Sequence, residues 1–282
     1  MADFENIFQK GSRTFYNSTF FFPTKIREQI TRLYAFVRRA DDYVDSIPQD
    51  SNEFYNFKNK FIQARDEFQK KLVLESDNSE DSLIIKSFVS LEVELDFDKK
   101  WADAFLKSME MDLTKKTYLN LEETKEYIYG SANVIGLFMA KIMNLPASAY
   151  ESAQNLGLAF QYINFIRDIV EDIDLQRNYF PQDLMKKYGL NTLEFTEINK
   201  KTENFQFFVK EVIDQYLEWQ KEAEKGFKYI PKKYLVAIKT ASDMYKWTAL
   251  KIASNPLVVY KRKIKPSKLR ILSTALANYL KL

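Results

Sequence analysis

The sequence predicts an all-α fold in a single domain spanning residues 1–282. Only 6 of the 282 residues are Gly and 7 are Pro, so turn-forming residues are scarce and long helices are favoured. Apolar residues recur at helical spacing, whereas we find no fixed-period repeat, low-complexity linker or long alternating strand pattern. Hydrophobic residues make up 46% of the chain, which is enough to bury a sizeable core.

The composition also restricts the chemistry. The chain contains no Cys and no His, which excludes thiolate nucleophiles, Ser-His-Asp triads and His- or Cys-ligated metals. Catalysis must then use carboxylates, Lys, Arg, Tyr, hydroxyls or amides. A bound metal would be a hard ion held by oxygen, such as magnesium, manganese or calcium. The formal net charge of +3 is too small to indicate a nucleic-acid partner, so none is expected.

Two further features bear on location and helix boundaries. The longest uncharged stretches, 127–140 and 152–166, are shorter than the ~20 apolar residues that a membrane-spanning helix needs. The first residues lack the basic and then apolar pattern of a signal peptide, so we expect a cytoplasmic protein, with peripheral contact at a membrane as the alternative. Helix breaks are expected at 46–52, 75–81, near 146, from 176 to 191 and near 255.

The first long helix is expected to begin near Ile26 and to carry an acidic pair on its inner face. Asp41 falls within its apolar stripe, and Asp45 lies one turn later at the edge of that stripe. Two buried carboxylates repel each other, and a divalent cation shared between them would offset that cost. This pair therefore suggests a metal site. The stripe consists of Ile26, Ile30, Leu33, Val37 and Val44.

A second acidic face is expected on a helix over residues 156–173. Apolar residues cover most of its circumference, which is typical of a helix at the centre of a bundle. Two amides and two carboxylates form its only polar strip, at spacing i, i+3, i+7 and i+11. These four residues are Gln161, Asn164, Asp168 and Asp172.

The spacing Asp-x-x-x-Asp is by itself a weak motif. It occurs a third time at Asp77 and Asp81, in a polar stretch that we interpret as solvated surface. For the other two pairs the alternative interpretation is a buried salt-bridge network, with Arg38 and Arg167 as available partners.

Five segments together resemble a known family. Two of them, 34–45 and 161–181, are similar to the two aspartate-rich motifs of the squalene and phytoene synthases, the second with a tyrosine-bearing tail. Segment 127–136 resembles that family's tyrosine- and glycine-bearing cavity helix, and segment 10–15 its Ser/Thr-bearing first helix. Segment 105–118 is similar to bacterial phytoene synthases in particular, and the resemblance extends over most of the chain.

This resemblance implies a helical bundle of the isoprenoid synthase type with a central cavity. It implies head-to-head (1-1') condensation of two prenyl diphosphates through a cyclopropyl diphosphate intermediate. Magnesium, or manganese in its place, would act as a Lewis acid on the diphosphates, whereas NADPH is not expected. The implied metal ligands are Asp41, Asp45, Asp168 and Asp172.

The resemblance also assigns roles to other residues. Aromatic rings stabilise cations without offering a nucleophile, and arginines offset phosphate charge. The implied catalytic residues are Tyr34, Arg38, Tyr127, Gln161, Asn164 and Tyr179. The implied substrate-binding residues are Ser12, Thr14, Arg38, Arg167, Arg177, Tyr245 and Arg262.

The favoured interpretation is a phytoene synthase-like prenyl transferase that joins two geranylgeranyl diphosphates. The alternatives are a thirty-carbon squalene or dehydrosqualene synthase that uses farnesyl diphosphate, and a non-catalytic helical protein that binds prenyl lipid. The basic segment 261–270 carries six Lys or Arg in ten residues, a pattern that alone indicates an anionic-lipid or nucleic-acid patch. The resemblance implies diphosphate contact for this segment, which is the favoured interpretation, with an anionic lipid surface second and nucleic acid last. The sequence leaves the oligomeric state open.

Overall fold

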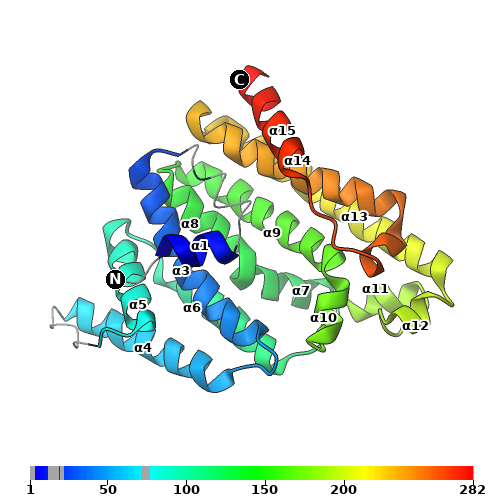
Figure 1. The fold of residues 1–282 in the computed structure, drawn as a ribbon, viewed down its shortest axis with the longest axis horizontal. Coiled ribbons are helices and arrows are strands. Elements are labelled where there is room, and N and C mark those ends of the chain that lie inside the picture. Colours follow the sequence, from blue (N-terminus) through cyan, green and yellow to red (C-terminus); the bar gives the residue numbers. More distant parts are fainter. Residues whose placement is uncertain (1–3, 12–18, 20–21, 71–76, 282) are drawn as a thin grey trace.

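The computed structural model of the chain describes residues 4–11, 19, 22–70 and 77–281. Throughout these residues the secondary structure is helical and contains no β-strand, which confirms the predicted all-α fold. Figure 1 shows α9 near the middle of the molecule, with α3 to α6 on one side and α13 to α15 on the other. Among the described residues we find no helix that is both long and apolar enough to cross a membrane.

The helices differ widely in length, and the longest ones form the frame of the fold. In chain order they are α1 (Phe4–Gly11), α3 (Thr24–Asp45), α4 (Ser51–Gln69), α5 (Glu80–Glu94), α6 (Lys99–Thr114), α7 (Leu121–Ile128), the π-helix η2 (Tyr129–Asn133), α8 (Val134–Ile142), η3 (Ala147–Ala149), α9 (Tyr150–Arg167), α10 (Ile169–Asp174), α11 (Gln182–Lys187), α12 (Phe195–Ile198), α13 (Thr202–Glu224), η4 (Lys225–Tyr229), α14 (Lys232–Ser254), η5 (Pro256–Tyr260) and α15 (Lys268–Lys281).

Helix α3 forms as its apolar stripe predicts. Ile30, Leu33 and Val44 are almost fully buried, and the helix packs against α1, α4, α5 and α6. It ends at Asp45 because Ser46 turns to an extended conformation just before the Ile47-Pro48 peptide, where a helix is sterically disfavoured. The carboxylates near the end of α3 therefore lie next to the point where the chain leaves the helix.

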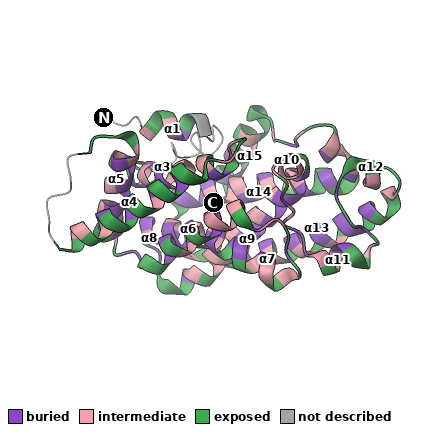
Figure 2. Cartoon of the chain, turned by 90° about the horizontal axis from the view of Figure 1, so that it is seen from below, coloured by how far each residue is buried: buried purple, intermediate pink, exposed green. Residues whose placement is uncertain are grey.

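The core consists of two apolar clusters that α9 connects. The first lies among α3, α4, α5, α6 and α8, where the rings of Phe36 and Phe88 stack with centroids 4.0 Å apart. The second lies around α9 and α13 and includes the fully buried Tyr162 and Tyr216. Tyr150 at the start of α9 packs against the first cluster, so this one helix joins both. In Figure 2 the buried residues lie between the helices and the exposed ones on their outer faces.

Two glycines allow the central helices to approach closely, as a glycine within a helix suggests. A Cβ atom on Gly130 would lie 2.1 Å from the carbonyl oxygen of Ala104 on α6. One on Gly136 would lie 2.2 Å from the carbonyl oxygen of Ala153 on α9. Only glycine fits at either contact, and the segment from η2 to α8 is thereby held between α6 and α9.

The helix expected over 156–173 is divided, which corrects the prediction of a continuous helix. Helix α9 ends at Arg167, and α10 starts after Asp168, whose backbone (φ −106°, ψ 14°) is not helical. Asp has a low helix propensity because its short side chain competes for local hydrogen bonds. Here the Asp168 carboxylate accepts two hydrogen bonds from the adjacent Arg167, at 2.8 and 2.6 Å.

The interpretation of Asp77 and Asp81 as solvated surface is wrong for Asp81. This residue lies in the first turn of α5, where its carboxylate accepts a hydrogen bond of 2.7 Å from the Tyr43 hydroxyl. The signal was present in the sequence, because Ser79 is a favourable N-cap and acidic residues are favoured in the turn that follows.

Candidate active site

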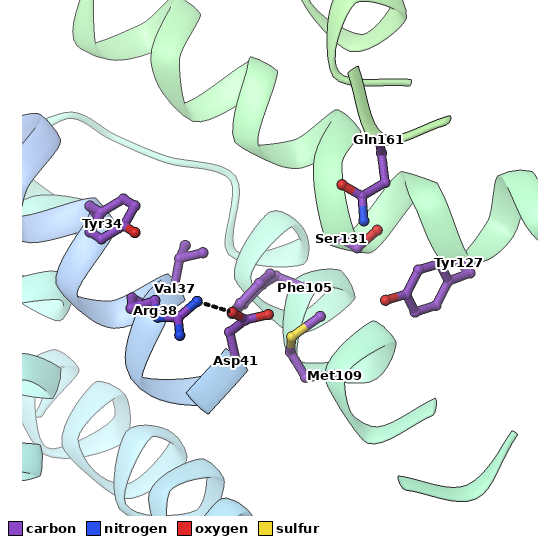
Figure 3. Close-up of a pocket in the computed structure, with 9 residues that line it drawn as sticks. All are labelled: Tyr34, Val37, Arg38, Asp41, Phe105, Met109, Tyr127, Ser131 and Gln161. Carbon is purple, nitrogen blue, oxygen red and sulfur yellow. Dashed lines mark hydrogen bonds and ion pairs between the residues drawn. The ribbon is translucent and has the colours of Figure 1, made fainter. Parts of the chain in front are cut away.

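Helices from both halves of the chain surround a pocket of about 150 Å³. Figure 3 shows side chains from α3, α6, α7, η2 and α9 converging on it. Five of the predicted site residues contribute to its lining, together with Val37, Phe105, Met109 and Ser131. These five are Tyr34, Arg38, Asp41, Tyr127 and Gln161.

Helix α3 contributes an arginine and a carboxylate to the pocket. Nη1 of Arg38 lies 2.8 Å from Oδ2 of Asp41, and Arg38 also pairs with Asp42. One-third of the Asp41 side chain is exposed, but it faces the pocket rather than the outer surface. Burial, followed by repulsion from Asp45, raises the pKa of Asp41 to about 8. Without a cation, this carboxyl therefore retains its proton near neutral pH.

A buried carboxylate, Asp112 on α6, holds two of the predicted site residues. The hydroxyl groups of Tyr127 and Tyr179 each donate a hydrogen bond of 2.7 Å to it, one to each oxygen. Burial raises the pKa of Asp112 to about 6, while Arg177 and both tyrosines oppose that rise. Burial, followed by the charge of Asp112, raises the pKa of both tyrosines well above 10, so they remain neutral phenols.

Arg177 connects Asp112 to the end of α3. Its Nη1 lies 2.6 Å from Oδ1 of Asp45, and its Nη2 donates a 2.5 Å hydrogen bond to the carbonyl oxygen of Val44. Its Nε is 3.8 Å from Oδ1 of Asp112 and is a buried atom without a hydrogen-bond partner among the described residues. The guanidinium group thus lies between two carboxylates and is almost completely buried.

The second acidic pair approaches from α9 and α10. Asp168 pairs with Arg167 and also with Lys263, whose Nζ lies 3.0 Å from Oδ1 of Asp168. Burial, followed by repulsion from Asp168, raises the pKa of Asp172 well above its usual value, and Asp45 and Asp112 add to the rise. The carboxylates of α3, α6 and α10 therefore influence one another across the site.

Two amides on α9 and a hydroxyl on η2 add further polar groups to the site. Asn164 donates a 3.3 Å hydrogen bond from its Nδ2 to Oε1 of Gln161, and Gln161 lines the pocket. The Oδ1 atom of Asn164 and the Oγ atom of Ser131 are buried without hydrogen-bond partners in the described part of the chain. Because such atoms are costly when unpaired, both are suited to contact a bound ligand.

The other predicted residues lie away from this pocket or outside the described part. The ring of Tyr245 on α14 stacks on Phe160 of α9, with centroids 4.2 Å apart, and contributes to the electrostatic environment of Arg167. Arg262 is exposed, whereas its neighbour Lys263 reaches Asp168. Ser12 and Thr14 lie outside the residues that the structure describes.

The donor set is compatible with a hard divalent cation. Four aspartates supply the oxygen ligands that magnesium prefers, and the pKa values of Asp41 and Asp172 are raised partly because neighbouring carboxylates repel them. In the described residues no three acidic side chains are grouped closely enough to hold an ion as they stand. Arg177 and Arg167 instead neutralise Asp45 and Asp168.

Asp112 and Ser131 belong to the site but were not predicted from the sequence. Asp112 follows Phe105 and Met109 at spacing i, i+4 and i+7 on the buried face of α6. An acidic residue on an apolar stripe was the signal used for Asp41, and it would have identified Asp112 as well. Ser131 carried no comparable signal.

We compared the sequence and the fold of the chain with those of known proteins. The profile of the squalene/phytoene synthase family matches residues 8–270. The chain belongs to this family.

The chain is similar to a curated relative in sequence and to solved structures in fold. A 15-cis-phytoene synthase from Enterobacter agglomerans is 28% identical over 249 residues, which cover 86% of this chain and 82% of the relative. The fold is similar to that of a dehydrosqualene synthase in complex with a ligand, with a TM-score of 0.81, 23% identity and coverage of 99% and 95% of the two chains. A squalene synthase from Alicyclobacillus acidocaldarius gives a TM-score of 0.74 at 17% identity, with 91% and 93% covered. As a member of this family the protein is a prenyl transferase with an isoprenoid synthase fold.

We expect Asp112→Ala to destabilise this family member by about 3 kcal/mol or more, because two buried hydroxyls and Arg177 would lose their partner. Urea denaturation would measure the change. Asp214→Ala is the matched control, since Asp214 is 62% exposed in a surface pair with Lys210 and should cost at most about 1 kcal/mol. Similar stabilities for the two variants would contradict the buried role of Asp112.

The raised pKa of Asp41 predicts that the metal-free protein becomes less stable as the pH rises. The folded protein keeps the Asp41 proton up to about pH 8, whereas the unfolded chain releases it near pH 3.8. The folded state binds more protons across this interval, so its free energy of unfolding decreases with increasing pH. Melting temperatures in EDTA should decrease less steeply for Asp41→Asn than for the wild type, because an amide does not titrate. Equal slopes would show that Asp41 is not the titrating group.

Proposed function

We propose that the protein catalyses the head-to-head condensation of two geranylgeranyl diphosphates to phytoene. The observation that carries this proposal is a pocket with tyrosine and phenylalanine walls that Asp41 of α3 lines, with a second acidic pair at the α9–α10 junction near enough for Asp45 and Asp112 to raise the pKa of Asp172. The similarity to bacterial phytoene synthases over most of the chain favours the twenty-carbon substrate.

The polar end of the site suits diphosphate groups. Arg38, Arg167 and Arg177 all pair with aspartates there, and a guanidinium group can also bind phosphate oxygens in a bidentate manner. Each arginine can therefore exchange a carboxylate for a diphosphate oxygen when substrate binds. Magnesium bound by Asp41, Asp45, Asp168 and Asp172 would supply Lewis-acid assistance to the departure of diphosphate.

The apolar end suits a carbocation. The rings of Tyr34, Phe105 and Tyr127 line the pocket, and aromatic faces attract cations. Burial raises the pKa of Tyr34 to about 12, and burial also raises the pKa of Tyr127 well above its usual value. Both hydroxyls therefore remain protonated and are poor nucleophiles, so the wall can stabilise an allylic cation without trapping it.

The proposed reaction has two ionisations. Loss of diphosphate from the first substrate gives an allylic cation, which the double bond of the second attacks to form a cyclopropyl diphosphate with loss of a proton. Loss of the second diphosphate is followed by rearrangement to the 1-1' linkage and release of another proton. The sequence of steps yields phytoene, two diphosphates and two protons, and it consumes no reductant.

A product assay tests this proposal directly. The purified protein and magnesium would be incubated with geranylgeranyl or farnesyl diphosphate, each with and without NADPH, and the products identified by mass spectrometry. We expect a forty-carbon hydrocarbon from geranylgeranyl diphosphate in the absence of NADPH. A thirty-carbon product alone would show that the substrate is farnesyl diphosphate instead. Prenyl alcohol alone or no product would contradict the proposed condensation.

Variants of the acidic pairs provide the controls for this assay. Asp41→Asn and Asp168→Asn should each reduce turnover by about a thousandfold or more while leaving the protein folded, because each removes a charge needed at the departing diphosphate. Asp214→Asn, on the exposed surface of α13, should retain full activity. Near-normal activity of both site variants would contradict the assignment of these aspartates.

A further inference from the structure

Helix α15 packs on α14 through a narrow polar face (Figure 1). Its buried residues are Ala275 and Asn278. Asn278 donates hydrogen bonds from its Nδ2 to Oδ2 of Asp243 at 2.8 Å and to Oγ1 of Thr240 at 3.3 Å. Near the other end of α15, the guanidinium group of Arg270 lies over the Trp247 ring, 4.8 Å from its centroid. These contacts fix the orientation of the helix on α14.

The outward face of α15 is apolar. Five of the fifteen exposed large hydrophobic residues in the described chain belong to this one helix, and each is at least 60% exposed. At helical spacing they fall within an arc of about 100°, on the side away from Asn278. We refer to these residues as the apolar stripe of α15: Leu269, Leu272, Leu276, Tyr279 and Leu280.

This arrangement reverses the usual pattern of a surface helix. Such a helix normally turns its leucines to the core and its polar residues to water. Here small and polar side chains face α14, and the leucines face outward. A contiguous exposed apolar surface of this kind is typical of an interaction site rather than of a solvated face.

The charge around the stripe indicates what covers it. The last 39 residues, which follow Asp243, contain nine of the chain's 42 Lys and Arg and none of its 39 Asp and Glu. Lys265 and Lys268 precede the stripe, and Lys281 follows it. A second copy of the chain on this face would bring like charges together, which is unfavourable. A surface with negative charge and an apolar interior matches both features.

We propose that α15 docks the protein on a bilayer that contains anionic phospholipid. The apolar stripe enters the boundary between headgroups and acyl chains, and the surrounding lysines and arginines contact the phosphates. The segment leading into α15 also contacts Asp168 through Lys263, so the chain that connects α15 to η5 runs past the acidic end of the site. The proposal rests on the surface of α15 and is independent of which prenyl diphosphate the protein uses.

Vesicle flotation with the full chain tests the proposal. We expect binding to vesicles of equal parts phosphatidylcholine and phosphatidylglycerol, and much weaker binding to phosphatidylcholine alone or at high salt. The double variant Leu272→Gln/Leu276→Gln should bind anionic vesicles at least about tenfold more weakly, because two leucines no longer enter the apolar layer. Leu119→Gln is the matched control, since Leu119 is 61% exposed outside α15 and its substitution should leave binding unchanged.

Three results would overturn the proposal. These are failure of the wild type to bind anionic vesicles, equal binding by the double variant, and a wild-type dimer that the double variant converts to a monomer without vesicle binding. The melting temperature of each variant should remain close to that of the wild type, because the substituted side chains are exposed. Turnover with substrate dispersed in detergent, measured separately, should also be unchanged, which distinguishes loss of docking from loss of catalysis.

Discussion

Repulsion between carboxylates that share a poorly hydrated space is the constraint on which this structure depends. Asp41, Asp112 and Asp172 come from three helices, and the pKa of each is raised by burial and by neighbouring acids. Such a cluster is stable only where protons, cations or hydrogen-bond donors compensate its charge. The structure supplies the donors, in the form of Arg177 and two tyrosine hydroxyls.

The surrounding fold holds these compensating groups in place. Arg177 ties the end of α3 to Asp112, and the same carboxylate accepts hydrogen bonds from Tyr127 on α7 and from Tyr179, which follows α10. The close contact at Gly130 brings η2 against α6 and so positions the end of α7 beside Asp112. The charge of the site and the packing of the central helices therefore depend on each other.

Helical periodicity was sufficient to predict α3 and the inward position of Asp41, because both follow from neighbours within a few turns. It could not place Arg177 on Asp45, since 132 residues separate them along the chain. Nor could it show that Tyr179 reaches Asp112, 67 residues away. The break at Asp168 was also missed, because it depends on local side-chain hydrogen bonds rather than on the apolar pattern.

The orientation of the C-terminal helix α15 also could not be predicted from the sequence. Its basic residues are evident in the sequence, but periodicity does not reveal which side of a helix meets the protein. In the structure Asn278 is buried, and Leu272 and Leu276 are exposed, which is the reverse of the arrangement that hydrophobicity favours in a globular protein. Only the position of α14 makes this orientation clear.

We propose that the acidic residues of α3 and α10 act as one unit on a diphosphate. A double-mutant cycle on Asp41→Asn and Asp172→Asn tests it most directly, with magnesium-dependent binding of an inert prenyl thiodiphosphate as the measured quantity. Either substitution alone should remove nearly all of the magnesium-dependent gain in affinity, and the second should add little. Losses that simply add, as for two independent sites, would contradict it.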